Sequence, residues 1–288
     1  MGDVMVFGFS ADPLLALRII LKGASLPQLA RRAGQSATEL PGRNGGFAFG
    51  IPSGVAARHN RPMSQAKRAA GILAAQQVES GQALGLGTGS TVEPFLDELA
   101  RRVRDEGLRV RGVPTSQRTE RRARELGIEI ASLEQLPSLD LCIDGADEID
   151  PKLRMIKGGG GALLREKVVA RSAARMLIVV DESKCVDRLG TTFALPIEVV
   201  PFALPLVRRE LGDFGAQLVL RQDAGEEYRT DNGNAILDAR FPDGIEDPER
   251  IERMMGEVPG VVCVGLFLGL ADGRVVGRAD GTAGLAWA

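Results

Sequence analysis

Three carboxylates and a lysine lie within one short stretch of this chain and could together move a proton. The stretch from 139 to 167 reads LDLCIDGADEIDPKLRMIKGGGGALLREK. It holds Asp144 and Asp147 in an acidic turn, then Lys157, and then Glu166. A carboxylate beside groups that stabilise a negative oxygen is what removal of a proton next to a carbonyl requires. The stretch therefore indicates acid–base chemistry performed by carboxylates.

Consecutive glycines follow the lysine and predict an anion site. Gly158 to Gly161 would let several backbone N–H groups converge on one negative oxygen. The segment from 162 onward is rich in helix formers, and the N-terminus of a helix adds partial positive charge. Glu166 would lie about one turn into this helix, where the helix dipole favours its ionised form.

Two simpler interpretations of the stretch remain open. An acidic turn after a strand can be only a solvated loop, and four glycines can be only a flexible one. The acidic residues could also hold Mg²⁺ or Ca²⁺, but they lack the ligand spacing of an EF-hand, and Lys157 would oppose a nearby cation. We expect neither a metal nor a cofactor.

A second loop predicts a place for a phosphate group. The residues GTGST at 87–91 lie between a predicted strand over 81–86 and a predicted helix from 92 to about 105. Backbone N–H groups and hydroxyls at such a helix start can hold a phosphate. The string is neither the dinucleotide G-x-G-x-x-G nor a Walker A motif, so a compact phosphomonoester suits it better. A plain tight turn is the alternative.

The order of elements predicts a parallel sheet that brings these groups together. The apolar run at 176–180 is typical of a buried parallel strand. Strands alternate with helices from residue 64 onward, which favours a Rossmann-like α/β sheet with helices on both faces. Polar groups follow three of the strands, at 88–91, 144–147 and 181–184. The carboxyl ends of parallel strands share one edge, so we expect these groups to converge.

A smaller second domain is expected after residue 195. Strands are predicted near 197–200, 217–221, 235–241 and 261–268, with helices over 205–211 and 248–257. That β-α-β-β-α-β order is the ferredoxin-like α+β arrangement. We therefore expect a catalytic α/β domain over 63–195 and 270–288 and a ferredoxin-like domain over 196–269.

Residues 1–62 differ in character from the rest of the chain. The part over 41–62 is rich in Gly, Asn and Pro, and we expect this N-terminal extension to be mostly irregular. An Arg-rich, acid-poor leader is compatible with an organelle transit peptide. The interpretation that we favour is that Met63 is the true start.

Composition excludes several classes of function. A net charge of −2 and only 4% aromatic residues argue against nucleic acid as a partner. No apolar run approaches ~20 residues, so we expect no membrane span. The three cysteines are scattered, which argues against a disulfide framework or a zinc site and indicates a cytoplasmic protein. The single histidine, His59, leaves acid–base work to other groups.

The combined motifs resemble those of ribose-5-phosphate isomerase type A. They are GTGST at 87–91, DGADEID at 144–150, KGGGGALLREK at 157–167, DESK at 181–184, TDNGN at 230–234 and PGVVCVGLF at 259–267. The resemblance covers the chain from about residue 63 to near its end. It implies interconversion of D-ribose 5-phosphate and D-ribulose 5-phosphate in the pentose phosphate pathway, without metal or redox cofactor, by a homodimer.

The resemblance also implies a role for each matching residue. Glu166 would be the general base that shuttles the proton between C2 and C1. Asp144 and Lys157 would handle the substrate oxygens, and Asp147 would assist ring opening. The implied substrate-binding residues are Thr88, Gly89, Ser90, Thr91, Gly145, Ala146, Gly158, Gly159, Gly160, Lys184 and Lys67. The glycine loop is one residue richer in Gly than the family's KGGGA form, with the Lys-to-Glu spacing kept.

Two kinds of rival function remain. Another enzyme of the same broad fold is one, such as a glucosamine-6-phosphate deaminase or a coenzyme A transferase. A deaminase would be expected to use a histidine, and His59 lies in the extension. The other is a regulator that binds sugar phosphates without catalysis. Such a protein would be expected to have lost the catalytic carboxylate, whereas Glu166 is present.

Overall fold

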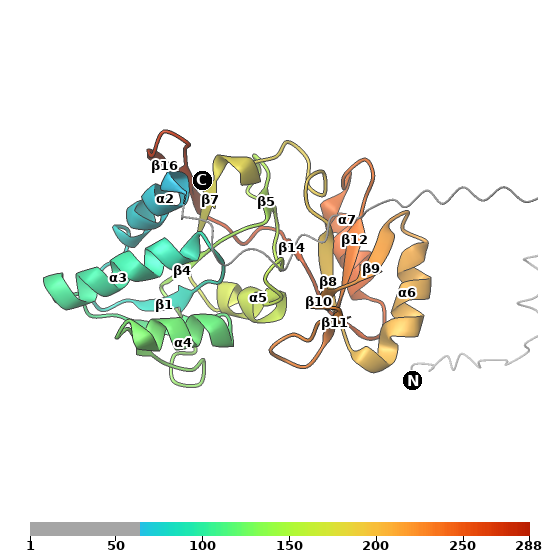
Figure 1. Cartoon of the computed structure of the whole chain (residues 1–288), viewed down its shortest axis with the longest axis horizontal. Coiled ribbons are helices and arrows are strands. Elements are labelled where there is room, and N and C mark those ends of the chain that lie inside the picture. Colours follow the sequence, from blue (N-terminus) through green and yellow to red (C-terminus); the bar gives the residue numbers. More distant parts are fainter. Residues whose placement is uncertain (1–63) are drawn as a thin grey trace, which may run out of the picture. The chain divides into compact units, whose positions relative to one another are not determined.

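The structure is a computed structural model, and it describes residues 64–288 (Figure 1). The expectations for residues 1–62, which were an irregular extension, a transit peptide or an upstream start, lie outside the described residues. Within 64–288, no helix combines the length and the apolar character that crossing a membrane requires.

The larger sheet has seven strands in the order β16-β15-β7-β4-β1-β2-β3. Every neighbouring pair is parallel except β15 and β16, which are antiparallel. The strands are β1 (Ala83–Leu86), β2 (Arg111–Pro114), β3 (Glu129–Ile130), β4 (Leu141–Asp144), β7 (Met176–Asp181), β15 (Gly273–Gly277) and β16 (Ala283–Trp287). The predicted parallel α/β sheet is thus confirmed, and the last residues of the chain add two strands to it.

Helices cover both faces of this sheet because alternate strand residues point to opposite sides. Leu141 and Ile143 pack in one core with Phe95, while Cys142 between them packs in another with Leu163. The helices of this part are α2 (Gln65–Ala75), α3 (Val92–Glu106), α4 (Gln117–Glu125) and α5 (Leu163–Arg171). Helices α2 and α3 therefore line one face of the sheet, and α5 lines the other.

The smaller sheet has four antiparallel strands in the order β13-β8-β12-β9. Its elements are β8 (Leu195–Val199), α6 (Leu204–Gly212), β9 (Gln217–Leu220), β12 (Ala235–Arg240), α7 (Pro248–Gly256) and β13 (Val261–Val264). This confirms the ferredoxin-like order. Short elements that the sequence did not indicate are the hairpin of β10 (Gln222–Asp223) with β11 (Glu226–Glu227), and the 3₁₀ turns η1 (Glu182–Lys184) and η2 (Pro201–Ala203).

The prediction of one continuous strand over 261–268 is wrong, because the strand breaks at Gly265. β13 pairs with β8, whereas β14 (Leu266–Phe267) pairs with β6 (Met155–Ile156), which also pairs with β5 (Glu148–Ile149). Gly265 donates to Pro196 O and accepts from Lys157 N. A side chain at Gly265 would place Cβ 2.5 Å from Lys157 O, so only glycine lets these backbones meet.

Helix α5 lies between the two sheets. Its buried residues Leu163, Val169 and Ala170 share a core with Ile178 of the larger sheet and with Ile236 of the smaller one. Helices α6 and α7 pack on the opposite face of the smaller sheet, through Val207, Leu211 and Met255 (Figure 1). The helix that carries Glu166 is therefore held from both sides.

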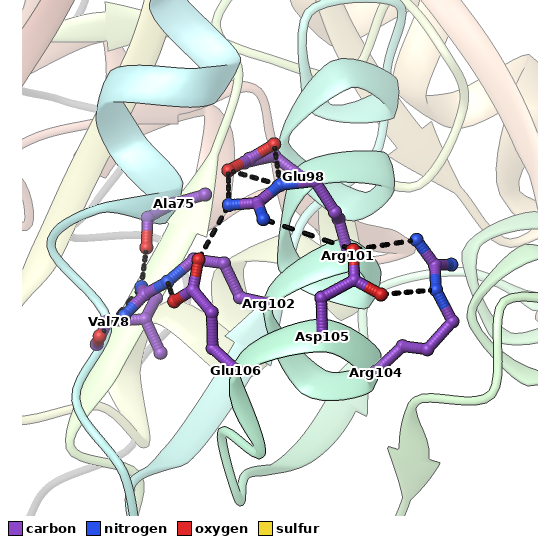
Figure 2. A network of polar contacts seen from close by, with 8 residues as sticks. All are labelled: Ala75, Val78, Glu98, Arg101, Arg102, Arg104, Asp105 and Glu106. Carbon is purple, nitrogen blue, oxygen red and sulfur yellow. Dashed lines mark hydrogen bonds and ion pairs between the residues drawn. The ribbon is translucent and has the colours of Figure 1, made fainter.

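A polar network at the end of α3 fixes the end of α2 (Figure 2). Arg102 donates to the main-chain oxygens of Ala75 and Val78, the latter at 2.9 Å, and pairs with Glu106 at 3.0 Å. The carbonyl groups at a helix end have no partner within the helix, so a guanidinium can satisfy them. This contact accompanies the end of α2 at Ala75.

We predict that Arg102→Met lowers the free energy of unfolding by about 2 kcal/mol, because two charge-assisted bonds to main-chain oxygens are lost. Within residues 64–288 its neighbour Arg104 pairs only with Asp105, and the Arg104 side chain is 69% exposed. Arg104→Met should therefore change the free energy of unfolding by less than about 0.5 kcal/mol. Urea denaturation of both variants measures the difference, and equal losses would contradict the role of Arg102.

Candidate active site

Three parallel neighbours, β1, β4 and β7, bring their following loops to one edge of the larger sheet. Leu86 at the end of β1 lies beside Ile143, and Asp144 at the end of β4 lies beside Ile178. The GTGST loop, the acidic turn and the DESK segment thus leave the sheet at the same end, as parallel strands require.

A buried ammonium joins two of the predicted catalytic carboxylates. Lys157 Nζ lies 3.0 Å from Asp144 Oδ2 and 3.0 Å from Glu166 Oε1, and it also donates to Gly145 O. The exposed fractions of the Lys157, Asp144 and Glu166 side chains are 2%, 0% and 6%. Charges removed from water this completely need opposite partners at close range. The three charged groups come from the end of β4, from the residue after β6 and from the first turn of α5.

Burial sets the acidity of this cluster. It raises the pKa of Glu166 to about 8, with the charge of Asp144 adding to the rise and that of Lys157 opposing it. The expectation that the helix N-terminus would favour the ionised form is therefore outweighed by the loss of water. Burial disfavours the Lys157 ammonium too, but Asp144 and Glu166 more than compensate and raise the pKa of Lys157 above its ordinary value.

One oxygen of Glu166 is held and the other is free. Oε1 accepts from Lys157, whereas Oε2 is buried and has no hydrogen-bond partner among residues 64–288. A carboxylate fixed by one oxygen keeps a directed lone pair on the other. Together with a pKa near neutrality, this is the arrangement that a general base needs.

Asp144 connects this cluster to the GTGST loop. Its Oδ1 accepts from Thr88 N at 2.9 Å and from Gly145 N at 2.7 Å. A side chain at Gly87 would place Cβ 2.3 Å from the same oxygen, so the loop can approach Asp144 only with glycine there. The loop backbone is therefore positioned by the carboxylate.

The Thr88 side chain faces α4. Its hydroxyl lies within hydrogen-bond distance of three buried hydroxyls at the start of that helix, those of Thr115, Ser116 and Thr119. The Ser116 hydroxyl also accepts from Thr119 N, which caps α4. The hydroxyl cluster depends on the pairing of β1 with β2, which brings the start of α4 beside the loop after β1.

Asp147 connects the acidic turn to the glycine loop. Its Oδ2 accepts from Gly159 N at 2.7 Å. Burial raises the pKa of Asp147, and the charges of Lys157, Lys184 and Arg221 oppose the rise. Gly159 and Gly160 are exposed, and Gly160 N donates to no group in the described part of the chain. Gly158 has a φ of 104° and Gly161 a φ of 81°, values that favour glycine.

The remaining predicted residues lie at the entrance of the GTGST loop or nearby. Lys67 of α2 donates to Ser90 Oγ at 2.7 Å, and Thr91 is buried at the start of α3. Ser90 and Gly89 are exposed, while Ala146 is half-buried beside Asp147. Lys184 lies in η1 with Nζ 5.8 Å from the Phe193 ring centre, and it forms no ion pair within 64–288. The structure thus brings Lys67 to the loop, whereas the charge of Lys184 acts on Asp147.

The smaller sheet contributes residues that sequence reasoning did not assign to the site. In the turn at 230–234, Asp231 Oδ2 accepts from Gln117 N at 2.7 Å, and Asn232 Oδ1 accepts from Arg165 Nε at 3.0 Å. Glu198, fully buried on β8, accepts from the Thr230 hydroxyl at 2.9 Å. The TDNGN motif marked the turn, but nothing in the sequence indicated its contacts with α4 and α5.

Comparison with known proteins agrees with this geometry. Residues 111–281 match the family described as ribose 5-phosphate isomerase A (phosphoriboisomerase A). A ribose-5-phosphate isomerase A of Roseiflexus castenholzii is 52% identical over 217 residues, which cover 75% of this chain and 92% of the relative.

Solved structures give the same result. Ribose 5-phosphate isomerase A of Methanocaldococcus jannaschii is 36% identical with a TM-score of 0.73, covering 77% of this chain and 98% of that one. A D-ribose-5-phosphate isomerase in complex with phospho-erythronic acid is 37% identical with a TM-score of 0.74, covering 78% and 98%. The fold, the clustered motifs and these matches together show that the chain belongs to the ribose-5-phosphate isomerase A family.

Proposed function

We propose that this chain interconverts D-ribose 5-phosphate and D-ribulose 5-phosphate through an enediolate, in the non-oxidative branch of the pentose phosphate pathway. The observation that carries the proposal is Glu166, a buried carboxylate with one oxygen held by Lys157 and the other free. It lies at the same sheet edge as a loop suited to a phosphate group, and the family of the chain supports the same reaction.

Glu166 is the base in this mechanism. Its free oxygen takes the proton from C2 of the open-chain aldose, the C–H electrons form the C1–C2 double bond, and the carbonyl electrons move to O1. Glu166 then returns the proton to C1, while the proton of O2 passes to O1, so that O2 becomes the carbonyl oxygen of the ketose and O1 becomes a hydroxyl oxygen. No atom is gained or lost, so no redox partner is needed. One residue serves both steps because C1 and C2 are adjacent.

The negative oxygen of the enediolate needs hydrogen-bond donors. In the structure, Lys157 already donates to Gly145 O and Glu166 and is paired with Asp144. The exposed glycine loop adds the N–H of Gly160, which is free among the described residues. We propose that the substrate oxygens O1 and O2 form hydrogen bonds with Asp144, Lys157 and this loop. Asp147, whose pKa is raised by burial, is assigned to ring opening because it can carry a proton.

The phosphate end of the substrate is assigned to the GTGST loop. Its exposed residues Gly89 and Ser90 face solvent, and Lys67 brings an ammonium to the Ser90 hydroxyl at 2.7 Å. The start of α3 adds main-chain N–H groups and the positive end of a helix dipole. The resemblance to the family supports a contact of Lys184 with the phosphate end of the substrate as well.

The proposal includes a homodimer that works in the cytoplasm, supported by the resemblance. It also includes domain boundaries at 63–195 with 270–288, and at 196–269. The pairing of β15 with β7 supports these boundaries, because it returns the end of the chain to the larger sheet.

A coupled assay of ribulose 5-phosphate formation from ribose 5-phosphate tests the function. Proteins that begin at Met1 and at Met63 should both be active if residues 1–62 are dispensable. Binding of ribose 5-phosphate without turnover would point to a sugar-phosphate-binding regulator instead.

We predict that Glu166→Gln leaves the dissociation constant of ribose 5-phosphate nearly unchanged and lowers kcat by more than the ~10²–10⁴ usual for a general base. The amide keeps the shape of the side chain but cannot accept the C2 proton. Glu257→Gln, at an exposed position after α7, is the matched control and should keep full activity. A kcat for Glu166→Gln within tenfold of the parent would exclude Glu166 as the base.

The raised pKa of Glu166 predicts the pH profile. Only the ionised form accepts a proton, so kcat/KM should rise with pH and level off above about 8. Below that value it should fall by about tenfold per pH unit. Lys157 stays charged throughout, since its pKa is raised by both carboxylates. A profile that is flat between pH 6 and pH 9 would show that another group limits the reaction.

Chelation should leave activity unchanged. The place between Asp144 and Glu166 that a divalent cation would take holds the Lys157 ammonium, at 3.0 Å from each carboxylate. We therefore expect equal rates in the coupled assay after dialysis against EDTA and after dialysis against buffer alone. Activity lost on chelation and restored by Mg²⁺ would mean that the carboxylates bind a metal during turnover.

A further inference from the structure

Arg221, which lies between β9 of the smaller sheet and β10 of the hairpin, reaches the glycine loop between β6 and α5. Its Nη1 donates to Gly158 O at 2.8 Å and to Gly159 O at 3.3 Å. The rest of the guanidinium donates to both carboxylate oxygens of Asp238 on β12, with Nε 2.9 Å from Oδ2. Only 12% of the Arg221 side chain is exposed. A bidentate pair of this kind fixes the plane of the guanidinium.

Tyr228 holds the next peptide from the same side. Its hydroxyl donates to Gly160 O at 3.3 Å, and its ring centre lies 5.8 Å from the Arg221 guanidinium carbon. A side chain at Gly161 would place Cβ 2.0 Å from this hydroxyl, which shows how closely the loop packs on the tyrosine. Three successive carbonyl groups, those of residues 158 to 160, thus accept hydrogen bonds from Arg221 and Tyr228.

These contacts determine where the loop's N–H groups point. In a trans peptide the C=O and N–H bonds are nearly antiparallel, so a carbonyl turned toward Arg221 turns the next N–H away from it. The affected N–H groups are those of Gly159, which donates to Asp147 at 2.7 Å, and Gly160, which is free among residues 64–288. Glycine peptides have little conformational preference of their own, so an external partner has to select this orientation.

We propose that Arg221, fixed by Asp238, is a positioning residue for the reaction: it turns the glycine-loop peptides so that their N–H groups face Asp147 and the reacting oxygens. This inference rests on the proposed function. It gives the segment that follows β9 an indirect part in the chemistry, because Arg221 acts through the glycine loop. The Arg221 charge also acts on Asp147, whose pKa it lowers against the effect of burial.

Steady-state kinetics of Arg221→Ala tests the proposal. We expect kcat to fall by about 10²-fold, the cost of a misplaced catalytic group, while KM changes by less than about threefold because the phosphate is held elsewhere. Added guanidinium ion should restore part of the lost kcat by occupying the vacated place. Phospho-erythronate, whose carboxylate mimics the enediolate, should bind more weakly by roughly the factor lost in kcat/KM.

Arg229→Ala is the matched control. Arg229 is an exposed arginine of the same segment, and its guanidinium pairs with Glu227 at 3.1 Å rather than with the loop. It should keep the parent kcat, and guanidinium should not change its rate. Asp238→Asn leaves Arg221 in place but unpaired on one side, and it should lower kcat by a smaller factor than Arg221→Ala.

The outcomes distinguish a positioning role of Arg221 from a purely structural one. A kcat within threefold of the parent for Arg221→Ala overturns it, as does a loss of kcat that guanidinium leaves untouched while the melting temperature falls. Should the alanine variant fail to fold, Arg221→Lys decides, since it keeps the charge but cannot bind two carbonyls and Asp238 together. A reduced kcat at unchanged KM then supports the proposal, and an unchanged kcat contradicts it. An inactive parent protein would overturn the proposed function instead.

Discussion

The site depends on one buried interaction, the Lys157 ammonium between Asp144 and Glu166. Two carboxylates this close together and this far from water could not both ionise without a cation beside them. The lysine is itself kept charged by them, because both carboxylates raise the pKa of Lys157. Because Asp144 also accepts from Thr88 N, the same ammonium indirectly supports the GTGST loop. The carboxylate cluster and the GTGST loop are therefore connected through Asp144 and the Lys157 ammonium.

The position of α5 explains how such a centre can stay rigid. The helix is packed between two sheets, so Glu166 cannot move without disturbing the core shared by Leu163 and Ile236. The turn at 230–234 adds polar contacts to Arg165 and to the first N–H of α4. The smaller sheet thus packs against α5, and the turn at 230–234 reaches α4 as well. The proposed base needs rigid support of this kind in order to stay within reach of two adjacent carbon atoms.

Local chemistry could be predicted from the sequence, whereas contacts between distant segments could not. The parallel strands, the convergence of their polar ends and the Asp144, Lys157 and Glu166 cluster follow from short motifs whose spacing carries the chemistry. The break of the last strand at Gly265 depends on two other backbones meeting there. Arg221 lies 63 residues from Gly158, and nothing near it in the sequence marks a partner. The raised pKa of Glu166 was missed for a related reason, since burial is decided by packing.

The two glycine-containing motifs are typical of loops that bind an anion. At two of these glycines, however, a neighbouring carboxylate leaves no space for a side chain. A Cβ at Gly87 would meet Asp144, and a Cβ at Gly159 would lie 2.5 Å from Asp147 Oδ1. These positions cannot drift while the acids remain, whatever the substrate. Exposed Ser90 and its partner Lys67 carry no such restriction. Over evolution the outer residues of the loop can therefore change, and with them the contacts to a bound phosphate, while Gly87 stays fixed beside Asp144.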